Sequence, residues 1–251
     1  MKFDMHIHTI YSDGKSTPKD VVEIAKAKNI GFCVTDHNHI KDSIKSLNLA
    51  INSGISSVIG MELGTKEGKE LLFYFKDSFL SEQFYIKEVE SYKTSRMTRI
   101  RRCMWEFLGE NLKDLKDEYK IFFTCYPHPF APLYKNHKSD ILLTSQILKS
   151  VDCVEVINAT MSKNANKMAY FLALKNLKFM SASTDAHIKS AIGNATTEIK
   201  FDEFEDIINT NITHNFYKDN ALTTGLSLYE ITKINLKYAF LNELNLKAKF
   251  E

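Results

Sequence analysis

The chain has 251 residues, of which 44% are hydrophobic and 25% are charged. These fractions are close to the averages of globular proteins and exclude an intrinsically disordered chain. With 33 Lys and Arg against 31 Asp and Glu, the net charge is only +2, which argues against a protein that mainly coats nucleic acid or an anionic membrane. One large domain, such as an α/β barrel, fits this length.

Neither a membrane span nor a secretory signal is visible in the sequence. No apolar run approaches the roughly 20 residues that a spanning helix needs, and the first residues lack an apolar core and a cleavage site. The four cysteines, at positions 33, 103, 125 and 153, are too far apart for a Cys-x-x-Cys motif. Three of them lie in short apolar, β-branched or aromatic runs: Cys33, Cys125 and Cys153. We therefore expect buried, reduced thiols in a cytoplasmic protein.

Short β-type runs alternate with helical stretches. Strands are predicted at residues 3–8, 32–37, 56–62, 71–75, 121–126, 153–158 and 178–184. Thr17 followed by Pro18 predicts the start of a helix that ends near residues 29–31, and Gly54 predicts the end of a helix at 41–53. Further helices are predicted at 82–108, 141–149 and 164–176. This alternation predicts a parallel sheet, either open or closed into a barrel.

Two regions depart from simple alternation. Residues 63–70 are too few for a helix, so the third and fourth strands are predicted to join by a tight turn. After the last strand, residues 195–199 and 202–211 predict a small strand and helix. A final helix should begin at Ser227, whose spacing to Glu230 is typical of a capping box. Its apolar face, which packs on the same domain or in a dimer, would comprise Ile231, Ile234, Tyr238 and Leu241.

Acidic and imidazole side chains recur where the predicted strands end. Asp4, His6 and His8 are spaced by two, so a strand points all three to one face. Two such imidazoles can bind one cation, with Asp4 beneath them as an acceptor. Asp13-Gly14 follows in the next loop. The other four strand-end motifs are Thr35-Asp36-His37-Asn38, Gly60-Met61-Glu62, Pro127-His128-Pro129-Phe130 and Asp185-Ala186-His187. In α/β barrels this rim carries the active site.

The chemistry of these side chains indicates a metal centre. Imidazoles with carboxylates and no cysteine suit Zn, Mn or Fe, whereas an all-oxygen site would suit Mg or Ca. Each motif alone has an ordinary explanation, as an incidental histidine pair, a turn or a helix cap. Five of them at strand ends together predict metal binding.

The motifs together resemble the PHP (polymerase and histidinol phosphatase) family of metal-dependent phosphoesterases. The resemblance covers residues 1 to about 195 and rests on Asp4-Met5-His6-Ile7-His8-Thr9, Ser12-Asp13-Gly14, Thr35-Asp36-His37-Asn38, Gly60-Met61-Glu62, Pro127-His128-Pro129-Phe130, Val154-Glu155-Val156-Ile157-Asn158 and Thr184-Asp185-Ala186-His187. It implies an α/β fold, a distorted (βα)7 TIM-like barrel with a C-terminal helical extension. Residues 1–251 would form one domain, with the core motifs in 1–195 and an appended strand and helices in 196–251.

The resemblance also implies two or three divalent ions (Mn, Zn or Fe) and their ligands. The first ion would be held by His6, His8, Glu62 and Asp185. Glu62 would bridge to a second ion bound by His128, and a third would be held by Asp13, His37 and His187. Family members usually supply one more histidine where this chain has Glu70 or Leu71. Glu70 is therefore either a substitute oxygen ligand or a solvated loop carboxylate.

The implied function is hydrolysis of a phosphoester. A metal-bound hydroxide, held by the ligands of the first ion, would attack phosphorus. Against the carboxylates of Asp13, Glu62 and Asp185, two divalent ions leave a charge of +1 and three leave +3, which favours an anionic substrate. The expected substrate is a small phosphorylated molecule, a nucleotide or a short oligonucleotide, with no membrane partner. The alternatives are a metal-dependent amidohydrolase that cleaves C–N bonds and a non-catalytic metal-binding module.

Several residues near these motifs keep two interpretations. His39 is either a proton donor to the leaving group or a loop histidine, and His137 and His214 are expected at the surface. Glu155 and Asn158 have opposite strand parity, so at most one should face the barrel interior; Asn158 is the candidate for substrate contact. Asp36, like Asp4, is expected to support the ligands. Thr160 occupies the place of a frequent family arginine, so phosphate recognition must come partly from elsewhere.

The densest basic cluster comprises Lys93, Arg96, Arg99, Arg101 and Arg102. It is either a guide for a nucleotide or single-stranded nucleic acid or a solvated helix face. In the second interpretation Met97, Ile100, Met104 and Phe107 pack inward.

Overall fold

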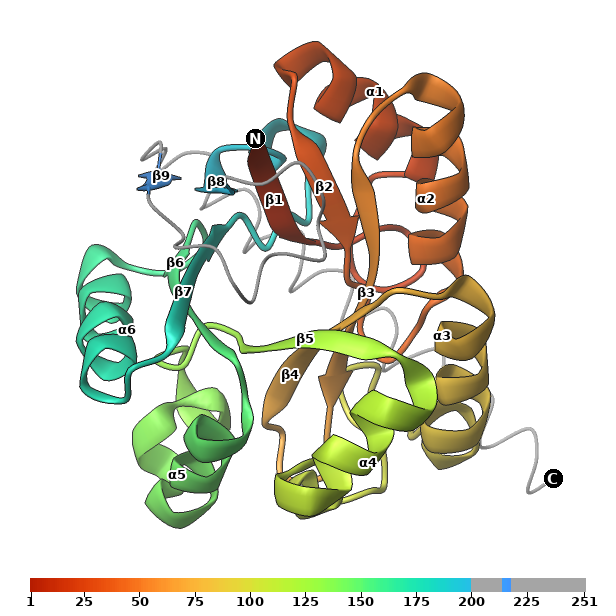
Figure 1. The fold of residues 1–251 in the computed structure, drawn as a ribbon. Coiled ribbons are helices and arrows are strands. Elements are labelled where there is room, and N and C mark those ends of the chain that lie inside the picture. Colours follow the sequence, from red (N-terminus) through yellow and green to blue (C-terminus); the bar gives the residue numbers. More distant parts are fainter. Residues whose placement is uncertain (200–213, 218–251) are drawn as a thin grey trace, which may run out of the picture.

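A single curled sheet organises the chain. The computed structural model describes residues 1–199 and 214–217. Nine strands form a sheet in the order β7-β6-β5-β4-β3-β2-β1-β8-β9, which bends into a nearly closed barrel with the helices outside (Figure 1). The predicted α/β barrel is confirmed. The helices predicted at 202–211 and from Ser227 onward lie outside the described residues.

The elements follow the predicted order. The strands are β1 (Lys2–Ile7), β2 (Gly31–Val34), β3 (Ser57–Gly64), β4 (Glu70–Phe75), β5 (Ile121–Tyr126), β6 (Cys153–Asn158), β7 (Phe179–Ser183), β8 (Ala195–Glu198) and β9 (His214–Tyr217). The helices are α1 (Pro18–Lys28), α2 (Lys41–Ser53), α3 (Ser78–Phe84), α4 (Gly109–Tyr119), α5 (Ile141–Ser150) and α6 (Lys163–Lys175). All seven barrel strands predicted from the sequence are confirmed, as is the appended strand β8. Helix α4 is not among the predicted helices.

Helix α1 begins and ends where its capping residues predict, and helix α2 ends where Gly54 predicts. Thr17 caps α1 with a full capping box: its hydroxyl accepts from the Asp20 backbone N–H, and the Asp20 carboxylate accepts from the Thr17 backbone N–H at 2.8 Å. The helix ends at Asn29, whose φ of 53° is left-handed. Helix α2 ends at Gly54 with φ 69°. These caps satisfy backbone groups that helix termini leave without partners.

One strand of the barrel is reversed. β3 and β4 form an antiparallel hairpin in which Gly64 lies opposite Glu70, and the Thr65 N–H closes the turn on Lys69 O at 3.0 Å. The predicted tight turn is confirmed. Because β4 runs against its neighbours, its first residue lies at the rim where the parallel strands end. Opposite residues of an antiparallel pair share a face, so Glu70 faces the same side as Glu62.

The barrel closes between β1 and β7. At the rim, Ile7 pairs with Ala186, and the His8 N–H donates to Ala186 O at 2.9 Å. At the other end, β8 pairs antiparallel with β1, and the Thr197 hydroxyl bonds to both the N–H and the carbonyl of Ala182 in β7. The closure brings the residues that follow β1 beside those that follow β7.

The prediction of a helix over residues 82–108 is wrong for its second half, where the chain is irregular. After α3 the chain continues through a π-helical turn (Tyr85–Val89) and a 3-10 turn (Glu90–Tyr92), then runs irregularly to the 3-10 turn Met104–Phe107. The irregular part pairs with the rim instead: the Ile100 N–H donates to Gly64 O at 3.0 Å, and the Lys66 N–H to Arg102 O at 2.9 Å. Tertiary backbone pairing outweighs the weak local preference for helix.

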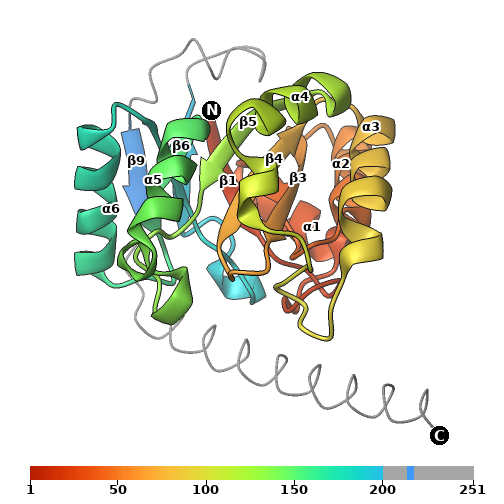
Figure 2. The same ribbon diagram turned by 90° about the horizontal axis from the view of Figure 1, so that it is seen from below.

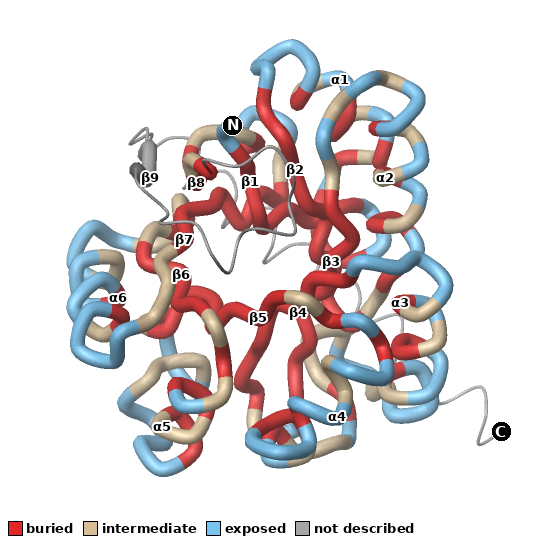
Figure 3. Tube along the Cα trace, in the orientation of Figure 1, coloured by how far each residue is buried: buried red, intermediate tan, exposed pale blue. Residues whose placement is uncertain are grey.

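The core is the barrel wall. Figure 3 shows a ring of buried strand residues, while the outer faces of the helices are exposed. Seen from below, α5 and α6 lie at the left of the barrel and α1, α2 and α3 at its right (Figure 2). Cys33, Cys125 and Cys153 are buried free thiols, as expected, and Cys103 is a partly buried one. Within the described residues, no helix is long and apolar enough to cross a membrane.

Candidate metal centre

Two histidines at the end of β1 approach each other through their Nε2 atoms, 3.0 Å apart. The opposite nitrogen of each ring is already engaged. His6 Nδ1 lies 3.1 Å from Glu155 Oε1, which can only accept, so Nδ1 carries the proton. His8 Nδ1 lies 3.2 Å from Ser12 Oγ, and that hydroxyl donates its own proton to Asp36 Oδ1. Both Nε2 lone pairs therefore point at the same space, as in metal-ligating histidines.

Glu62, near the end of β3, lies at the middle of the cluster. Its Oε2 is 2.9 Å from His37 Nδ1, 3.3 Å from His8 Nε2 and 3.4 Å from His6 Nε2. Its Oε1 is 3.0 Å from His128 Nε2. One carboxylate thus touches four imidazoles that come from three strand ends, the arrangement expected of a bridging ligand.

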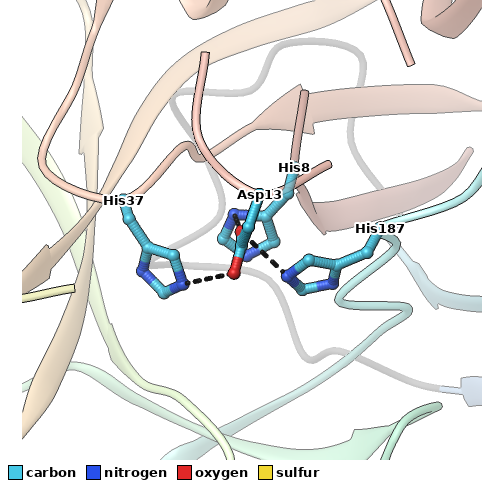
Figure 4. A group of neighbouring side chains, drawn as sticks. All are labelled: His8, Asp13, His37 and His187. Carbon is cyan, nitrogen blue, oxygen red and sulfur yellow. Dashed lines mark ion pairs between the residues drawn. The ribbon is translucent and has the colours of Figure 1, made fainter. Parts of the chain in front are cut away.

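A second group surrounds Asp13, which the loop after β1 carries into the barrel mouth. Its carboxylate lies 3.1 Å from His187 Nε2 and 3.7 Å from both His37 Nε2 and His8 Nδ1. The four side chains converge from different segments (Figure 4). His187 Nδ1 bonds to the Asp185 carbonyl at 2.8 Å, so its Nε2 is directed toward the centre.

Asp185 joins the two groups. Its Oδ1 lies 3.0 Å from His8 Nε2 and 3.5 Å from His6 Nε2. Its Oδ2 accepts from Asn158 Nδ2 at 3.2 Å and from the Thr160 hydroxyl at 3.3 Å. The carboxylate is therefore held in one orientation. The Asn158 amide is used in this support, with its oxygen accepting from Thr160 N at 2.9 Å.

Both Glu155 and Asn158 face the barrel interior, which corrects the expectation that at most one would. The register of β6 against β7 shifts between Glu155 and Ile157. Such a bulge adds one residue and so reverses the parity of the strand beyond it. Glu155 then reaches His6 Nδ1 through Oε1, while its Oε2 accepts from the His128 backbone N–H at 2.9 Å and from Asn158 Nδ2 at 2.8 Å. Strand alternation alone could not indicate that Glu155 supports the histidines, because it does not reveal the register shift.

The two other supporting carboxylates act on loops rather than directly on imidazoles. Asp36 accepts from the Thr9 N–H at 2.7 Å and from the Ser12 hydroxyl, and so fixes the loop that carries Asp13. Asp4 accepts from the Thr184 N–H at 3.0 Å and from the Gly193 N–H at 2.8 Å. Asp4 thus anchors the segment that delivers Asp185, and the His6 backbone also contributes a hydrogen bond to this carboxylate.

Three residues at the rim have a left-handed backbone conformation. Asn38, His128 and Asp185 have φ values of 50°, 27° and 51°, a region that residues other than glycine adopt at a cost and mostly at functional sites. Hydrogen bonds hold them there: the Asn38 amide, for example, bonds to Gly64 N and Met97 O, each at 2.9 Å.

Glu70 lies in the cluster and is not a solvated loop carboxylate. Its side chain is only 2% exposed, and its oxygens lie 3.9 Å from His37 Nδ1 and 3.7 Å from His128 Nε2. Its nearest charged partner is Lys135, whose Nζ is 2.7 Å from Oε2. Lys135 was not recognised in the sequence, because it stands seven residues beyond His128 in a loop without a motif.

Burial and charge act in opposite directions on these groups. Burial lowers the pKa of His8, but the carboxylates of Asp185, Glu62 and Asp13 outweigh it and raise the pKa to about 10. Burial raises the pKa of Asp185, but His6, His8 and His187 hold that pKa well below its usual range. Without ions, the carboxylates around His8 thus favour its protonated form, and a metal that binds this imidazole must displace the proton.

The donor set fits divalent metal ions. Glu62 Oε2 and His37 Nδ1 are 2.9 Å apart, yet they are not aligned as a hydrogen bond, and neither atom has another hydrogen-bond partner among the described residues. Two buried lone-pair atoms directed at one point are typical of ligands that share an ion. Ligand atoms lie within 4.8 Å of one another in four groups: His8, Asp13, His37 and His187; His6, His128 and Asp185; His6, His8 and Glu62; and His37, Glu62 and Glu70.

The remaining histidines lie away from the cluster. His39 is half-buried between the rings of Tyr11 and Tyr85, and burial with Lys93 and Lys41 lowers its pKa to about 4. A neutral imidazole whose Nδ1 accepts from the Lys41 N–H favours the loop interpretation. His137 is half-buried rather than a surface residue, because it packs on Tyr126 and Phe130. His214 lies in β9.

The basic cluster is not a solvated helix face. Its residues lie in the irregular segment, where Arg102 pairs with Glu88 and Glu106 and Arg99 stacks over Tyr134 at 4.1 Å. Lys93 donates to the Tyr85 hydroxyl at 2.9 Å. As expected, Ile100, Met104 and Phe107 are buried, whereas Met97 is only partly so.

The fold and the cluster define an α/β barrel protein with a histidine–carboxylate centre at the carboxyl ends of its parallel strands. The PHP domain family model matches residues 4–220. The chain belongs to the PHP domain family, as the resemblance of its motifs indicates.

Two uncharacterized proteins are similar to this chain in sequence. The chain is 36% identical to the uncharacterized protein MJ1587 of Methanocaldococcus jannaschii over 81 residues, 28% of this chain and 47% of that protein, so it matches about half the length of this relative. MJ0417 of the same organism is 29% identical over 207 residues, 81% of this chain and 71% of that protein.

Solved structures share the fold at low identity. PsfC from Pseudomonas syringae has a TM-score of 0.59 at 16% identity, covering 96% of this chain and 98% of its own. An Endonuclease Q in complex with a 27-mer duplex that carries an abasic lesion has a TM-score of 0.61 at 18% identity, covering 86% of this chain and 57% of its own. Identities this low show the fold alone.

Proposed function

We propose that this protein is a metal-dependent phosphoesterase. The observation that carries the proposal is the position of Glu62, one buried carboxylate in contact with His6, His8, His37 and His128. A carboxylate so placed can bridge two divalent ions. Membership of the PHP domain family supports the same assignment.

The proposed ligands are those that the family resemblance implies, with one addition. They are His6, His8, Asp13, His37, Glu62, His128, Asp185 and His187, together with Glu70 as an oxygen ligand beside His37 and Glu62. Two or three ions are proposed, and the nitrogen and oxygen donors suit Mn, Zn or Fe. When bound, the ions supply an activated water and neutralise charge on the phosphoryl group.

The residues of the chain supply orientation. Glu155 and Ser12 fix the tautomers of His6 and His8, so that both Nε2 atoms remain available. Asn158 and Thr160 hold Asp185 in place. Support of this kind fixes ligand geometry before the substrate arrives, which lowers the reorganisation that the reaction requires.

The proposed substrates are small phosphomonoesters, nucleotides and short oligonucleotides. The Endonuclease Q structure holds a duplex substrate, which supports a test of nucleic acid ends as well as small molecules. The protein should be loaded with Mn, Zn or Fe in turn and assayed against these phosphoesters and against amides. Hydrolysis of a phosphoester that is lost in both His8→Ala and Asp185→Ala supports the proposal. Hydrolysis of amides alone would assign an amidohydrolase instead, and metal binding without any hydrolysis would assign a binding module.

A further inference from the structure

Lys135 brings a positive charge into the metal centre. It ends the 3-10 turn Leu133–Lys135, and its Nζ lies 2.7 Å from Glu70 Oε2, while the lysine side chain remains 25% exposed. The ammonium thus connects the solvent-facing mouth with the buried carboxylate. It has three N–H donors, and Glu70 is its one ion-pair partner within the described part of the chain.

The space around this pair contains buried polar atoms without partners. Among the described residues, neither Glu70 Oε1 nor the Tyr126 hydroxyl makes a hydrogen bond, although both are buried. Tyr126 lies at the end of β5, and burial with the nearby Glu70 carboxylate raises the pKa of its hydroxyl. Buried polar groups are rarely left unpaired in native proteins, so this side of the centre is built to receive a further polar group.

Two other cations near the rim, Lys69 and Arg102, are committed elsewhere. Lys69 Nζ donates to Asn136 O at 2.6 Å and to Ser139 Oγ at 2.7 Å, and Arg102 pairs with Glu88 and Glu106. The place of the frequent family arginine holds Thr160, whose hydroxyl bonds to Asn158 Oδ1. Among these cations, Lys135 is the one whose partner belongs to the cluster itself.

We propose that Lys135 binds a non-bridging oxygen of the substrate's phosphoryl group and that Glu70 positions it for that contact. The inference rests on the proposed phosphoesterase function and assigns the residue that recognises the anion. A lysine binds phosphate as a point charge with rotatable donors, so the ammonium can keep its ion pair with Glu70 while its N–H groups face the phosphate.

The test measures the binding of inorganic phosphate to metal-loaded protein by calorimetry, alongside the KM and kcat of whichever phosphoester is hydrolysed. Lys135→Gln should weaken phosphate binding about tenfold to a hundredfold, as expected for loss of a charge-assisted hydrogen bond. KM should rise more than kcat falls, and metal content should not change. Lys135→Arg should recover part of the affinity. Lys138→Gln, which removes an exposed lysine three residues away, should leave phosphate affinity unaltered.

A double variant separates phosphate binding from ion pairing. Lys135→Gln leaves the Glu70 carboxylate without its cation, and that charge alone would repel phosphate. In the Glu70→Gln/Lys135→Gln double variant, the repulsion is absent. Because Glu70 is also a proposed metal ligand, the comparison is made at equal metal content, with Glu70→Gln alone as the reference. If phosphate affinity in the double variant stays below that of Glu70→Gln, the ammonium itself binds the anion. If the two affinities are equal, Lys135 only neutralises Glu70 and the proposal is overturned.

Two further outcomes distinguish this inference from the proposed function. If the wild-type protein hydrolyses phosphoesters and Lys135→Gln changes neither KM nor phosphate affinity, only the role of Lys135 is refuted. If the loaded wild-type protein hydrolyses no phosphoester, the phosphoesterase proposal fails, and the substrate role of Lys135 fails with it.

Discussion

His6 Nε2 and His8 Nε2 lie 3.0 Å apart, while the Nδ1 atom of each ring is engaged by Glu155 or Ser12. Two unprotonated imidazole nitrogens would repel each other at this distance, and a shared cation removes the repulsion. The spacing of the histidines along β1 makes this pair possible, and partners from distant segments select the tautomers. The centre therefore depends on residues that hold the ligands as much as on the ligands.

Replacing Glu155 by Gln should weaken metal binding about tenfold to a hundredfold, the usual effect of removing an outer hydrogen-bond partner. The amide is a poorer acceptor for His6 Nδ1 and leaves the choice of His6 tautomer less strongly fixed. Competition with a chelator measures the change. Glu118→Gln, which alters an exposed carboxylate paired with Lys87, is the control. Equal metal affinity in Glu155→Gln and the wild-type protein would refute the supporting role.

Replacing Glu62 by Ala should remove more bound metal than replacing His187 by Ala. Glu62 contacts four histidines, whereas His187 serves only the group around Asp13. Metal analysis of the purified variants gives the number of ions per chain, and activity on a phosphoester should fall by at least a thousandfold in Glu62→Ala. A variant lacking Glu62 that keeps the full metal content would contradict the bridging assignment.

Metal binding should release protons and strengthen as the pH rises. The pKa of His8 is raised to about 10 by its carboxylate neighbours in the metal-free protein, so near pH 7 this imidazole is protonated and a metal must displace its proton. The apparent affinity should therefore increase between pH 6 and pH 8. Calorimetry in two buffers of different ionisation enthalpy counts the released protons. Binding heats that do not depend on the buffer would disprove the displacement.

Replacing Thr17 by Ala should destabilise the protein by about 1 kcal/mol, the typical cost of losing a helix N-cap. The pKa of the second capping residue, Asp20, is lowered to about 2, mainly by its bond to Lys189 and then by Thr17. A lowered carboxyl pKa contributes stability above its unfolded value of 3.8 that is lost as the pH falls toward 2. Denaturant unfolding across this range measures the loss. In Asp20→Asn the loss of stability over this pH range should be smaller than in the wild-type protein, by the share that Asp20 contributes.

Local signals predicted most of the elements. The capping pattern at Thr17 and Pro18, the glycine at residue 54 and the β-branched runs each concern a few neighbouring residues, and the corresponding boundaries agree with the structure. The segment from 93 to 103 shows the limit of such signals. Its residues favour helix locally, yet Ile100 and Arg102 pair with the backbone of the β3–β4 hairpin, which sequence periodicity does not record.

The candidate ligands could be found from the sequence because metal binding requires particular donor side chains. The type of each side chain and its position relative to the predicted strands can both be read from the sequence. The reversal of β4 brings Glu70 to the rim, the bulge in β6 turns Glu155 inward, and a loop brings Lys135 to Glu70. Each of these depends on pairing between segments far apart in sequence. The sequence by itself thus determined the kind of centre, and tertiary pairing decided which further charges surround it.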